Sequence, residues 1–223
     1  MASDSASPSV VEGERLGRLI RLKPAYRERY IVLHKHPFPG VLEQIRASNI
    51  RNYSIFLAEH RLFSFFEYVG TDFAGDMAAM AEDPTTQDWW TLTDPMQESL
   101  LPAEADERWA TMTELYHGGP KQGPSQDATR AAFVWPGPDD PAPLAQAFEA
   151  VGDALDAAVA SAPLQNYSVY RWENRVYTYL EYTGDRLAAD LESFRASRPM
   201  RAVRDALPAS AEPSSMESVF YLA

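Results

Sequence analysis

The sequence predicts an α+β protein made of two copies of a β-α-β-β-α-β unit within one chain. The main observation is an internal repeat, because the phrase Asn-Tyr-Ser at residues 52–54 returns 114 residues later, at 166–168. The same offset continues to match residues without a gap over the stretch 59–76 of the first copy. A second observation is the run of Gly, Pro and polar residues at 118–125, which separates the copies. Self-similarity at a fixed offset marks a duplicated unit and decides the architecture.

The first copy is predicted to span residues 15–117. Alternation, prolines and capping residues predict, in order, a strand at 18–22, helices at about 25–35 and 38–48, strands at 53–57 and 61–68, a helix at 73–82, helical turns at 85–96 and a final strand at 109–117. The first two helices are separate because Pro37 and Pro39 interrupt the helical hydrogen bonds. Asp72 is placed to cap the helix that follows it. This order of elements is the ferredoxin-like arrangement.

The pattern restarts after the linker, which we place at residues 118–129. The second copy, 130–223, is predicted to contain a strand at 131–135, a helix at 143–160 and hairpin strands at 166–172 and 175–182. Its ending at 216–221 resembles the segment 112–117 of the first copy. Residues 1–14 are small and polar, so a disordered tail is expected there.

The composition is that of a soluble globular protein, with 45% hydrophobic, 23% charged and 12% aromatic residues among 223. The formal net charge of -12 and the pI near 4.8 repel phosphate backbones and anionic membranes, so neither is an expected partner. Cysteine is absent from the sequence, which excludes disulfides, thiolate catalysis and Cys-ligated metals. The sequence predicts no membrane-spanning helix and no signal peptide, and cytoplasmic is the default expectation.

Tyr30 and His34 are the first candidates for chemistry. They are four residues apart, so their side chains are neighbours on one face of a helix. Histidine titrates near neutral pH and exchanges protons, and tyrosine can donate a hydrogen bond or relay a proton. The pattern is equally typical of a buried histidine held by a tyrosine for structural reasons.

Trp89, Trp90 and Tyr53 are candidate binding residues. Adjacent tryptophans on a helix point about 100° apart, so one can pack while the other lines a pocket. Indole rings stack well on the C–H faces of sugars, although both rings could equally fill a core. Alternation places Tyr53 on the same side of its strand as Ile55 and Leu57, facing the helices.

The second copy lacks these candidates, with the exception of the tyrosine that matches Tyr53. Leu and Phe stand at the positions that match Tyr30 and His34, and Val and Arg stand opposite the two tryptophans; these residues are Leu144, Phe148, Val203 and Arg204. The retention of Tyr167 opposite Tyr53 favours a structural role for that tyrosine. We therefore expect one equipped copy and one copy that is a structural partner.

The remaining histidines indicate no metal site. His36 and His60 are expected at the surface, and His117 ends the final strand of the first copy, where it could reach the edge of a pocket. Scattered histidines without paired carboxylates are a poor metal-ligand set. The sequence has no phosphate-binding Gly-rich loop and no nucleophile elbow.

Taken in order, the motifs of the first copy resemble those of the L-rhamnose mutarotase family over about residues 16–117. The matching phrases are Tyr30-x-x-x-His34, Phe38-Pro39 where the family usually has Trp-Pro, Ile50-Arg-Asn-Tyr-Ser-Ile-Phe-Leu57, Trp89-Trp90 followed by Met96, and Met112-Thr-Glu-Leu-Tyr-His117. The second copy resembles the family only through its hairpin and its Glu217-Ser-Val-Phe-Tyr ending.

The resemblance implies a dimeric α+β barrel, in which the second copy takes the place of a separate partner chain as a pseudo-dimer; further association of whole chains is left open. It implies interconversion of the α and β anomers of a 6-deoxy-hexose, without a metal or an organic cofactor. By position it makes His34 the proton donor, with Tyr30, Tyr53, Trp89 and Trp90 contacting the sugar.

The chain departs from the family pattern near the histidine. The family commonly has basic residues where this chain has Ile31-Val32-Leu33, Gly40 replaces an acidic residue, and Phe38 replaces Trp. These changes predict a more apolar helix face and leave the substrate open. One alternative is a cyclase or cofactor-free oxygenase of the same barrel type, acting on an aromatic polyketide-like substrate in a flat apolar pocket with the tryptophans turned away. Another is a non-catalytic ligand-binding protein.

Overall fold

The computed structural model describes residues 14–103, 105, 107–119 and 127–223. The described chain forms two compact units, one of residues up to 111 together with 219–223, and one of residues 112–218. The predicted tail, 1–14, lies outside the described residues except for Glu14, which belongs to a strand. The middle of the predicted linker, 120–126, also lies outside them.

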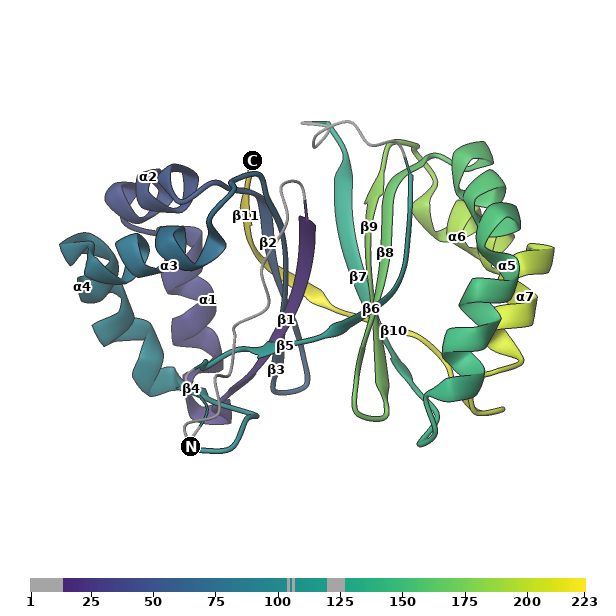
Figure 1. Cartoon of the computed structure of the whole chain (residues 1–223), viewed down its shortest axis with the longest axis horizontal. Helices are drawn as coiled ribbons and strands as arrows, with labels where there is room; N and C mark the ends of the chain where they lie inside the picture. The colour runs from purple at the N-terminus through teal and green to yellow at the C-terminus, as the bar shows by residue number, and fades with distance from the viewer. Residues whose placement is uncertain (1–13, 104, 106, 120–126) are drawn as a thin grey trace. The chain divides into compact units, whose positions relative to one another are not determined.

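The first unit is a sheet covered on one face by four helices (Figure 1). Its strands run in the order β11-β2-β3-β1-β4, with β5 also paired to β1. The strands are β1 (Glu14–Leu22), β2 (Ile50–Ala58), β3 (Arg61–Tyr68), β4 (Gln97–Glu98), β5 (Ala110–Thr111) and β11 (Glu217–Leu222). The helices are α1 (Arg27–Lys35), α2 (Pro39–Ala47), α3 (Phe73–Glu82) and α4 (Pro84–Thr93), with 3-10 turns at Pro24–Tyr26 and Asp94–Met96. The core lies between the helices and the sheet.

The second unit repeats this plan, with strands in the order β10-β7-β9-β8-β6. Its strands are β6 (Thr113–Gly118), β7 (Thr129–Pro136), β8 (Leu164–Trp172), β9 (Arg175–Tyr182) and β10 (Ser214–Ser215). Its helices are α5 (Ala142–Ser161), α6 (Leu187–Arg195) and α7 (Arg198–Arg204), and they enclose a separate core. The prediction of two ferredoxin-like repeats in an α+β chain is confirmed.

The two copies share local details as well as topology. The tight turns of their first hairpins each contain a glutamate with positive φ, 54° at Glu59 and 51° at Glu173. The predicted break in the first helical stretch is present between α1 and α2, whereas the second copy has the single helix α5 in its place. Gly40 allows α2 to approach α4 closely, because a Cβ atom there would lie 3.0 Å from Cγ2 of Thr85.

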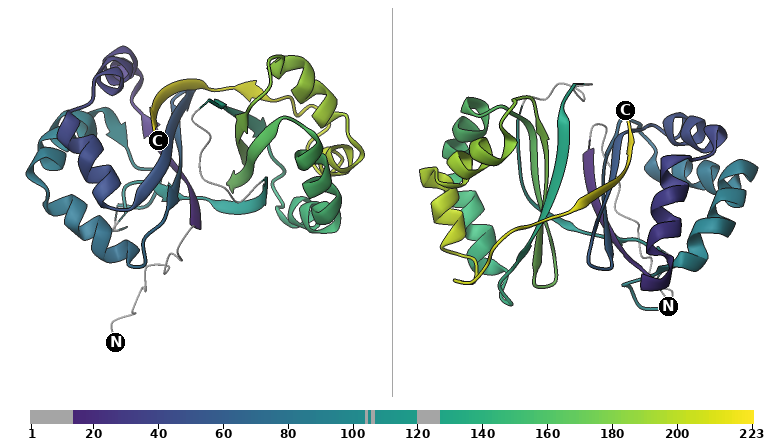
Figure 2. Two further views of the ribbon diagram at one scale, coloured as in Figure 1. Left: turned by 90° about the horizontal axis from the view of Figure 1, so that it is seen from above. Right: turned by 180° about the vertical axis from the view of Figure 1, so that it is seen from behind.

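The predicted final strand of the first copy, 109–117, does not run continuously. It breaks at the buried Met112, so that β5 pairs with β1 while β6 pairs with β8 of the second sheet. The second copy does the same at the buried Met216, where β10 pairs with β7 and β11 joins β2 of the first sheet. Each sheet thus takes an outer strand from the other half of the sequence, which pairs an edge that would otherwise be open. Figure 2 shows β11 running along the first sheet.

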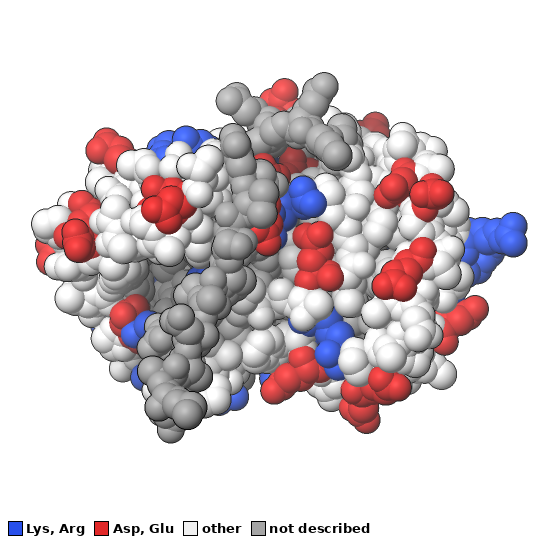
Figure 3. All heavy atoms as spheres, in the orientation of Figure 1, with Lys and Arg blue, Asp and Glu red and all other residues white. Residues whose placement is uncertain are grey.

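The surface agrees with the acidic composition. Figure 3 shows Asp and Glu side chains spread over the face in view, with Lys and Arg interspersed and not gathered into a continuous patch. Within the described residues, none of the helices has the length and apolar character that crossing a membrane requires.

We expect the exchanged strand to contribute strongly to the stability of the first unit. Phe220 on β11 is 8% exposed and packs in the core of that unit, so Phe220→Ala should lower the free energy of unfolding by about 3 kcal/mol. Ser218→Ala, at an exposed position of the same strand, should change it by less than about 0.5 kcal/mol. Urea unfolding of the two variants beside the wild type measures both effects. If the wild type and both variants unfold at the same urea concentration, β11 does not contribute to the stability of the first unit.

Candidate active site

The structure brings Tyr30 and His34 together as the sequence predicts. Their rings stack with centroids 3.9 Å apart on the inner face of α1, and both side chains are buried. The Tyr30 hydroxyl accepts a hydrogen bond of 3.2 Å from Nε2 of Gln97, in the short strand that follows α4. Burial raises the pKa of Tyr30 well above its ordinary value, so this tyrosine keeps its proton at neutral pH.

One hydrogen bond defines the tautomer of His34. Its Nδ1 atom lies 2.9 Å from the backbone carbonyl oxygen of Tyr30, one helical turn earlier. A carbonyl oxygen only accepts hydrogen bonds, so Nδ1 carries the proton and Nε2 retains a lone pair. Burial lowers the pKa of His34 to about 4, although the Tyr30 carbonyl opposes the shift. At neutral pH the side chain is therefore an uncharged base, which differs from the role of proton donor that the family resemblance implies.

The two tryptophans of α4 both line the pocket. Trp89 is 7% exposed and packs edge-on between His34, at 5.2 Å, and Phe38, at 5.3 Å between ring centroids. Trp90 is less buried and reaches the same cavity one position further round the helix. Phe38, which stands where the family usually has Trp, packs edge-on against Trp89 and does not line the cavity.

Tyr53 faces the helices, as alternation with Ile55 and Leu57 predicts, and a bulge in β2 brings Ile50 to the same face. The register of β2 against β3 shifts between Arg51 and Ser54, and Asn52 within the bulge has a φ of 50°. The extra residue places both Ile50 and Tyr53 on the helical side of the sheet, where simple alternation would place only one of them. Burial raises the pKa of Tyr53 to about 12, which the nearby Arg18 guanidinium partly offsets.

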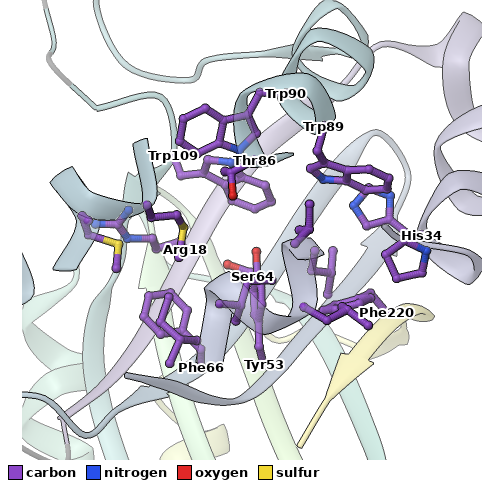
Figure 4. A pocket seen from close by; sticks show the side chains of 18 residues that line it. Arg18, His34, Tyr53, Ser64, Phe66, Thr86, Trp89, Trp90, Trp109 and Phe220 are labelled. Atoms are coloured by element: carbon purple, nitrogen blue, oxygen red, sulfur yellow. The ribbon is translucent and has the colours of Figure 1, made fainter. Parts of the chain in front are cut away.

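The site consists of two neighbouring cavities with lining residues in common, which we call the apolar chamber and the polar chamber. The apolar chamber has a volume of about 220 Å³ and the polar chamber about 360 Å³. Both are lined by a shared wall of nine residues: Arg18, His34, Tyr53, Ile55, Met77, Met80, Trp89, Trp90 and Trp109. The polar chamber alone also contacts Tyr30, Thr93, Asp94, Gln97, Glu107 and Arg108. All five predicted site residues therefore line this site in the first unit, and Figure 4 labels His34, Tyr53, Trp89 and Trp90 around the apolar chamber.

The apolar run beside His34 does not shape this pocket. Ile31 is buried in the core, Val32 is 58% exposed, and Leu33 packs against the core, but none of the three lines either chamber. The prediction that they make the face around His34 apolar was wrong, because successive helical residues point in different directions. The apolar wall comes from α2 and the start of β2.

Arg18 and Thr86 are pocket residues that the sequence reasoning missed. Thr86 is 2% exposed, and its hydroxyl has no hydrogen-bond partner within the described residues. The same holds for Nε of Arg18, whose Nη2 atom lies 3.5 Å from a carboxylate oxygen of Glu107. The internal repeat carried the signal for both, because the second copy has Ala132 and Met200 at these positions.

Phe220 was also missed, although it lies in the Glu217-Ser-Val-Phe-Tyr ending that resembles the family. Its ring lies 6.1 Å from His34 and 5.5 Å from Tyr53 between centroids, both edge-on, and it lines the apolar chamber. It comes from β11, at the far end of the sequence. A residue of the second copy thus completes the wall between the two titratable side chains.

The second copy shows the same site in a filled form. Its cavity is only about 30 Å³, and most of its lining residues, among them Phe148, Tyr167 and Met200, match residues of the first pocket. Phe148 replaces His34 and stacks on Tyr116, which occupies the place of Phe220 on the exchanged strand β6. The Tyr167 hydroxyl donates to Sδ of Met200 at 3.9 Å, whereas the matching Tyr53 hydroxyl has no such partner within the described residues. Larger apolar side chains have closed this pocket.

The other histidines lie away from the site. His36 and His60 are exposed, as predicted, and His117 lies in the second sheet with Nδ1 2.9 Å from the Ser168 hydroxyl. The described residues contain no cluster of three or more His, Asp or Glu side chains arranged to hold a metal ion.

The fold and the pocket define a class: a ferredoxin-like α+β protein with a buried neutral histidine in an aromatic cavity. The model of the family described as L-rhamnose mutarotase matches residues 15–118. The L-rhamnose mutarotase of Listeria monocytogenes strain EGD-e is 31% identical over 86 residues, which are 39% of this chain and 82% of that protein. The L-rhamnose mutarotase of Oceanobacillus iheyensis is 24% identical over 47% of this chain and 97% of its own length. The chain belongs to the L-rhamnose mutarotase family.

Solved structures resemble the fold across both copies. A putative monooxygenase from Fusobacterium nucleatum has a TM-score of 0.58 at 9% identity and covers 95% of each chain. A putative monooxygenase from Lactobacillus acidophilus has a TM-score of 0.57 at 8% identity, over 93% of this chain and 98% of its own. At such low identity the likeness concerns the fold alone.

We expect one imidazole of the folded protein to titrate with a midpoint of about 4, because burial disfavours the cation of His34. Proton-detected nitrogen NMR measures this midpoint, and at pH 7 it should also show the tautomer with hydrogen on Nδ1. His34→Gln should remove this signal and leave the other imidazole signals in place. A His34 midpoint near the ordinary 6.5, or hydrogen on Nε2, contradicts the buried geometry.

Proposed function

We propose that the protein is a mutarotase-type isomerase that interconverts the anomers of a 6-deoxy-hexose or a related reducing sugar. Membership of the family supports this activity, and the observation that carries it is the lone pair of His34 Nε2 at the wall of a cavity lined by two tryptophans. Aromatic rings suit the apolar faces of a sugar, and the polar chamber offers groups for its hydroxyls. The polyketide alternative required the tryptophans to turn away from the pocket, but both line it.

The chemistry follows from the protonation states. Nε2 of His34 takes the proton of the anomeric hydroxyl, the bond between the anomeric carbon and the ring oxygen breaks, and a carbonyl forms. The ring oxygen takes a proton from an acid on another side of the site. Rotation about the adjacent C–C bond and the reverse steps then give the other anomer. Free sugars already interconvert without a catalyst, so general acid–base catalysis of about 10²–10⁴-fold is sufficient.

We assign the acid to Tyr53. Its pKa of about 12 keeps it protonated, it lines both chambers, and the Phe220 ring packs edge-on against both it and His34. Tyr30 acts differently, because its ring stacks on the His34 imidazole and its carbonyl oxygen accepts from Nδ1, while its hydroxyl accepts a hydrogen bond from Gln97. We therefore regard Tyr30 as a positioning residue. Trp89 and Trp90 bind the sugar.

We propose that the second copy is a structural partner without activity of its own. Its pocket is filled, and it has Leu144 and Phe148 where the first copy has Tyr30 and His34. Its contribution to the site is the strand that carries Phe220.

Replacement of His34 should slow anomer exchange. We expect His34→Gln to lower kcat/KM by about 10²–10⁴-fold, because the variant lacks the base. Saturation-transfer NMR on L-rhamnose, L-fucose and related reducing sugars measures the rate. His60→Gln, at an exposed position, is the matched control and should exchange at the wild-type rate. Equal rates for wild type and His34→Gln on every sugar would remove His34 from the mechanism.

The two matching tyrosines provide a second test within one chain. Tyr53→Phe should lower kcat by about 10²-fold or more, because it removes the proposed acid and leaves the ring. Tyr167→Phe makes the same change in the filled pocket, and activity should not respond. The same NMR experiment compares them. If both variants lose activity equally, the tyrosines act through the fold, and the assignment of Tyr53 as acid fails.

A further inference from the structure

The two chambers have different linings, one with charged and amide groups and one mainly apolar, and a simple monosaccharide does not require such a division. The polar chamber has its own charged and amide groups, Asp94, Gln97, Glu107 and Arg108. The apolar chamber lies behind His34 under α2, where its own wall is formed by Val41, Leu42, Ile45 and Ile50. A sugar ring placed against His34 in the polar chamber leaves this apolar space without polar partners.

The apolar chamber is also large. The methyl group of a 6-deoxy sugar would occupy a small part of about 220 Å³. An engineered apolar cavity of about 150 Å³ in another protein admits benzene. Empty apolar space is unfavourable because the atoms that line it lose packing contacts. The fold does not require this space, because the matching cavity of the second copy is only about 30 Å³. The first copy therefore retains a cavity that larger side chains fill in the second copy.

Two hydroxyl side chains, Ser64 and Thr86, line the apolar chamber and not the polar chamber. The Thr86 hydroxyl points toward the centre of the pocket (Figure 4), is buried with its side chain, and has no hydrogen-bond partner within the described residues. A buried hydroxyl without a partner is destabilising, so such groups are normally hydrogen-bonded. At the matching position Met200 fills the cavity of the second copy. The Thr86 hydroxyl is therefore placed to bind an oxygen atom of a ligand in the apolar chamber.

We propose that the substrate is a reducing sugar with an O-linked apolar substituent, an alkyl, acyl or aryl group larger than methyl. The substituent enters the apolar chamber, the Thr86 hydroxyl donates a hydrogen bond to the linking oxygen, and the reducing end lies against His34 in the polar chamber. This inference rests on the proposed function, since it names the substrate class of the same site. Thr86 and Ile45 are then residues that determine specificity.

The test compares L-rhamnose with its 2-O-, 3-O- and 4-O-benzyl ethers, all with a free anomeric hydroxyl. Saturation-transfer NMR measures the exchange rates, and calorimetry measures binding of the same compounds. We expect at least one ether to have a kcat/KM at least tenfold above that of L-rhamnose, and to bind correspondingly more tightly.

Two variants probe the chamber directly. Ile45→Phe fills the apolar space, and Thr86→Val removes the hydroxyl while preserving the shape of the side chain. Each variant should bring the ratio of kcat/KM for the preferred ether to kcat/KM for L-rhamnose closer to one. Thr91→Val, at an exposed position of the same helix, should retain the wild-type ratio. Thr86→Val should also have an unchanged or higher melting temperature, because it removes an unpaired buried hydroxyl. If Ile45→Phe fails to fold, Thr86→Val still carries the test.

The outcomes separate the two proposals. Exchange of L-rhamnose with no preference for any ether overturns the assignment of the apolar chamber and leaves the mutarotase proposal standing. Preferential binding of an ether that Thr86→Val weakens, without exchange of any sugar, supports the chamber and overturns the proposed reaction. Neither exchange nor binding overturns both.

Discussion

The pairing of the last strand, β11, with β2 is the contact on which the site depends. It closes one edge of the first sheet and places Phe220 against both His34 and Tyr53. Without that ring the wall between the two side chains would be open, and water would reach the imidazole. Exclusion of water lowers the pKa of His34 and makes it a neutral base. One backbone pairing near the end of the chain therefore connects the integrity of the sheet to the chemistry of α1.

The two copies act as an internal comparison that few chains offer. They share topology, turn conformations and exchanged strands, but one holds a pocket and the other a packed core. Their differences include side chains that line the pockets: His34 against Phe148, and Thr86 against Met200. Because the fold tolerates the larger apolar residues, the polar and smaller residues of the first copy are not required for folding. Proteins commonly accept such local costs at functional sites.

Much of the fold could be predicted because its signals are local. The prolines between α1 and α2 and the spacing of Tyr30 and His34 lie within short stretches of sequence, and the duplication is found by aligning the sequence with itself. The interruption of the final strand at Met112 could not be predicted, since the choice between two sheet edges depends on which edge is open. The effect of Ile31–Leu33 was misjudged for a related reason: their direction relative to the cavity depends on how α1 is rotated against the sheet.

The amino-acid pattern was sufficient for the duplication and the ferredoxin-like order of elements, because both follow from periodicity and comparison of the copies; the resemblance to the family grouped Tyr30, His34, Tyr53, Trp89 and Trp90 as one expected site. Three-dimensional packing was needed for the tautomer of His34, the unpaired hydroxyl of Thr86, the arrival of Phe220 and the division of the pocket into two chambers. These properties arise from burial and from contacts between residues distant in sequence. Burial and long-range contact, unlike helical spacing, are determined only when the whole chain has folded.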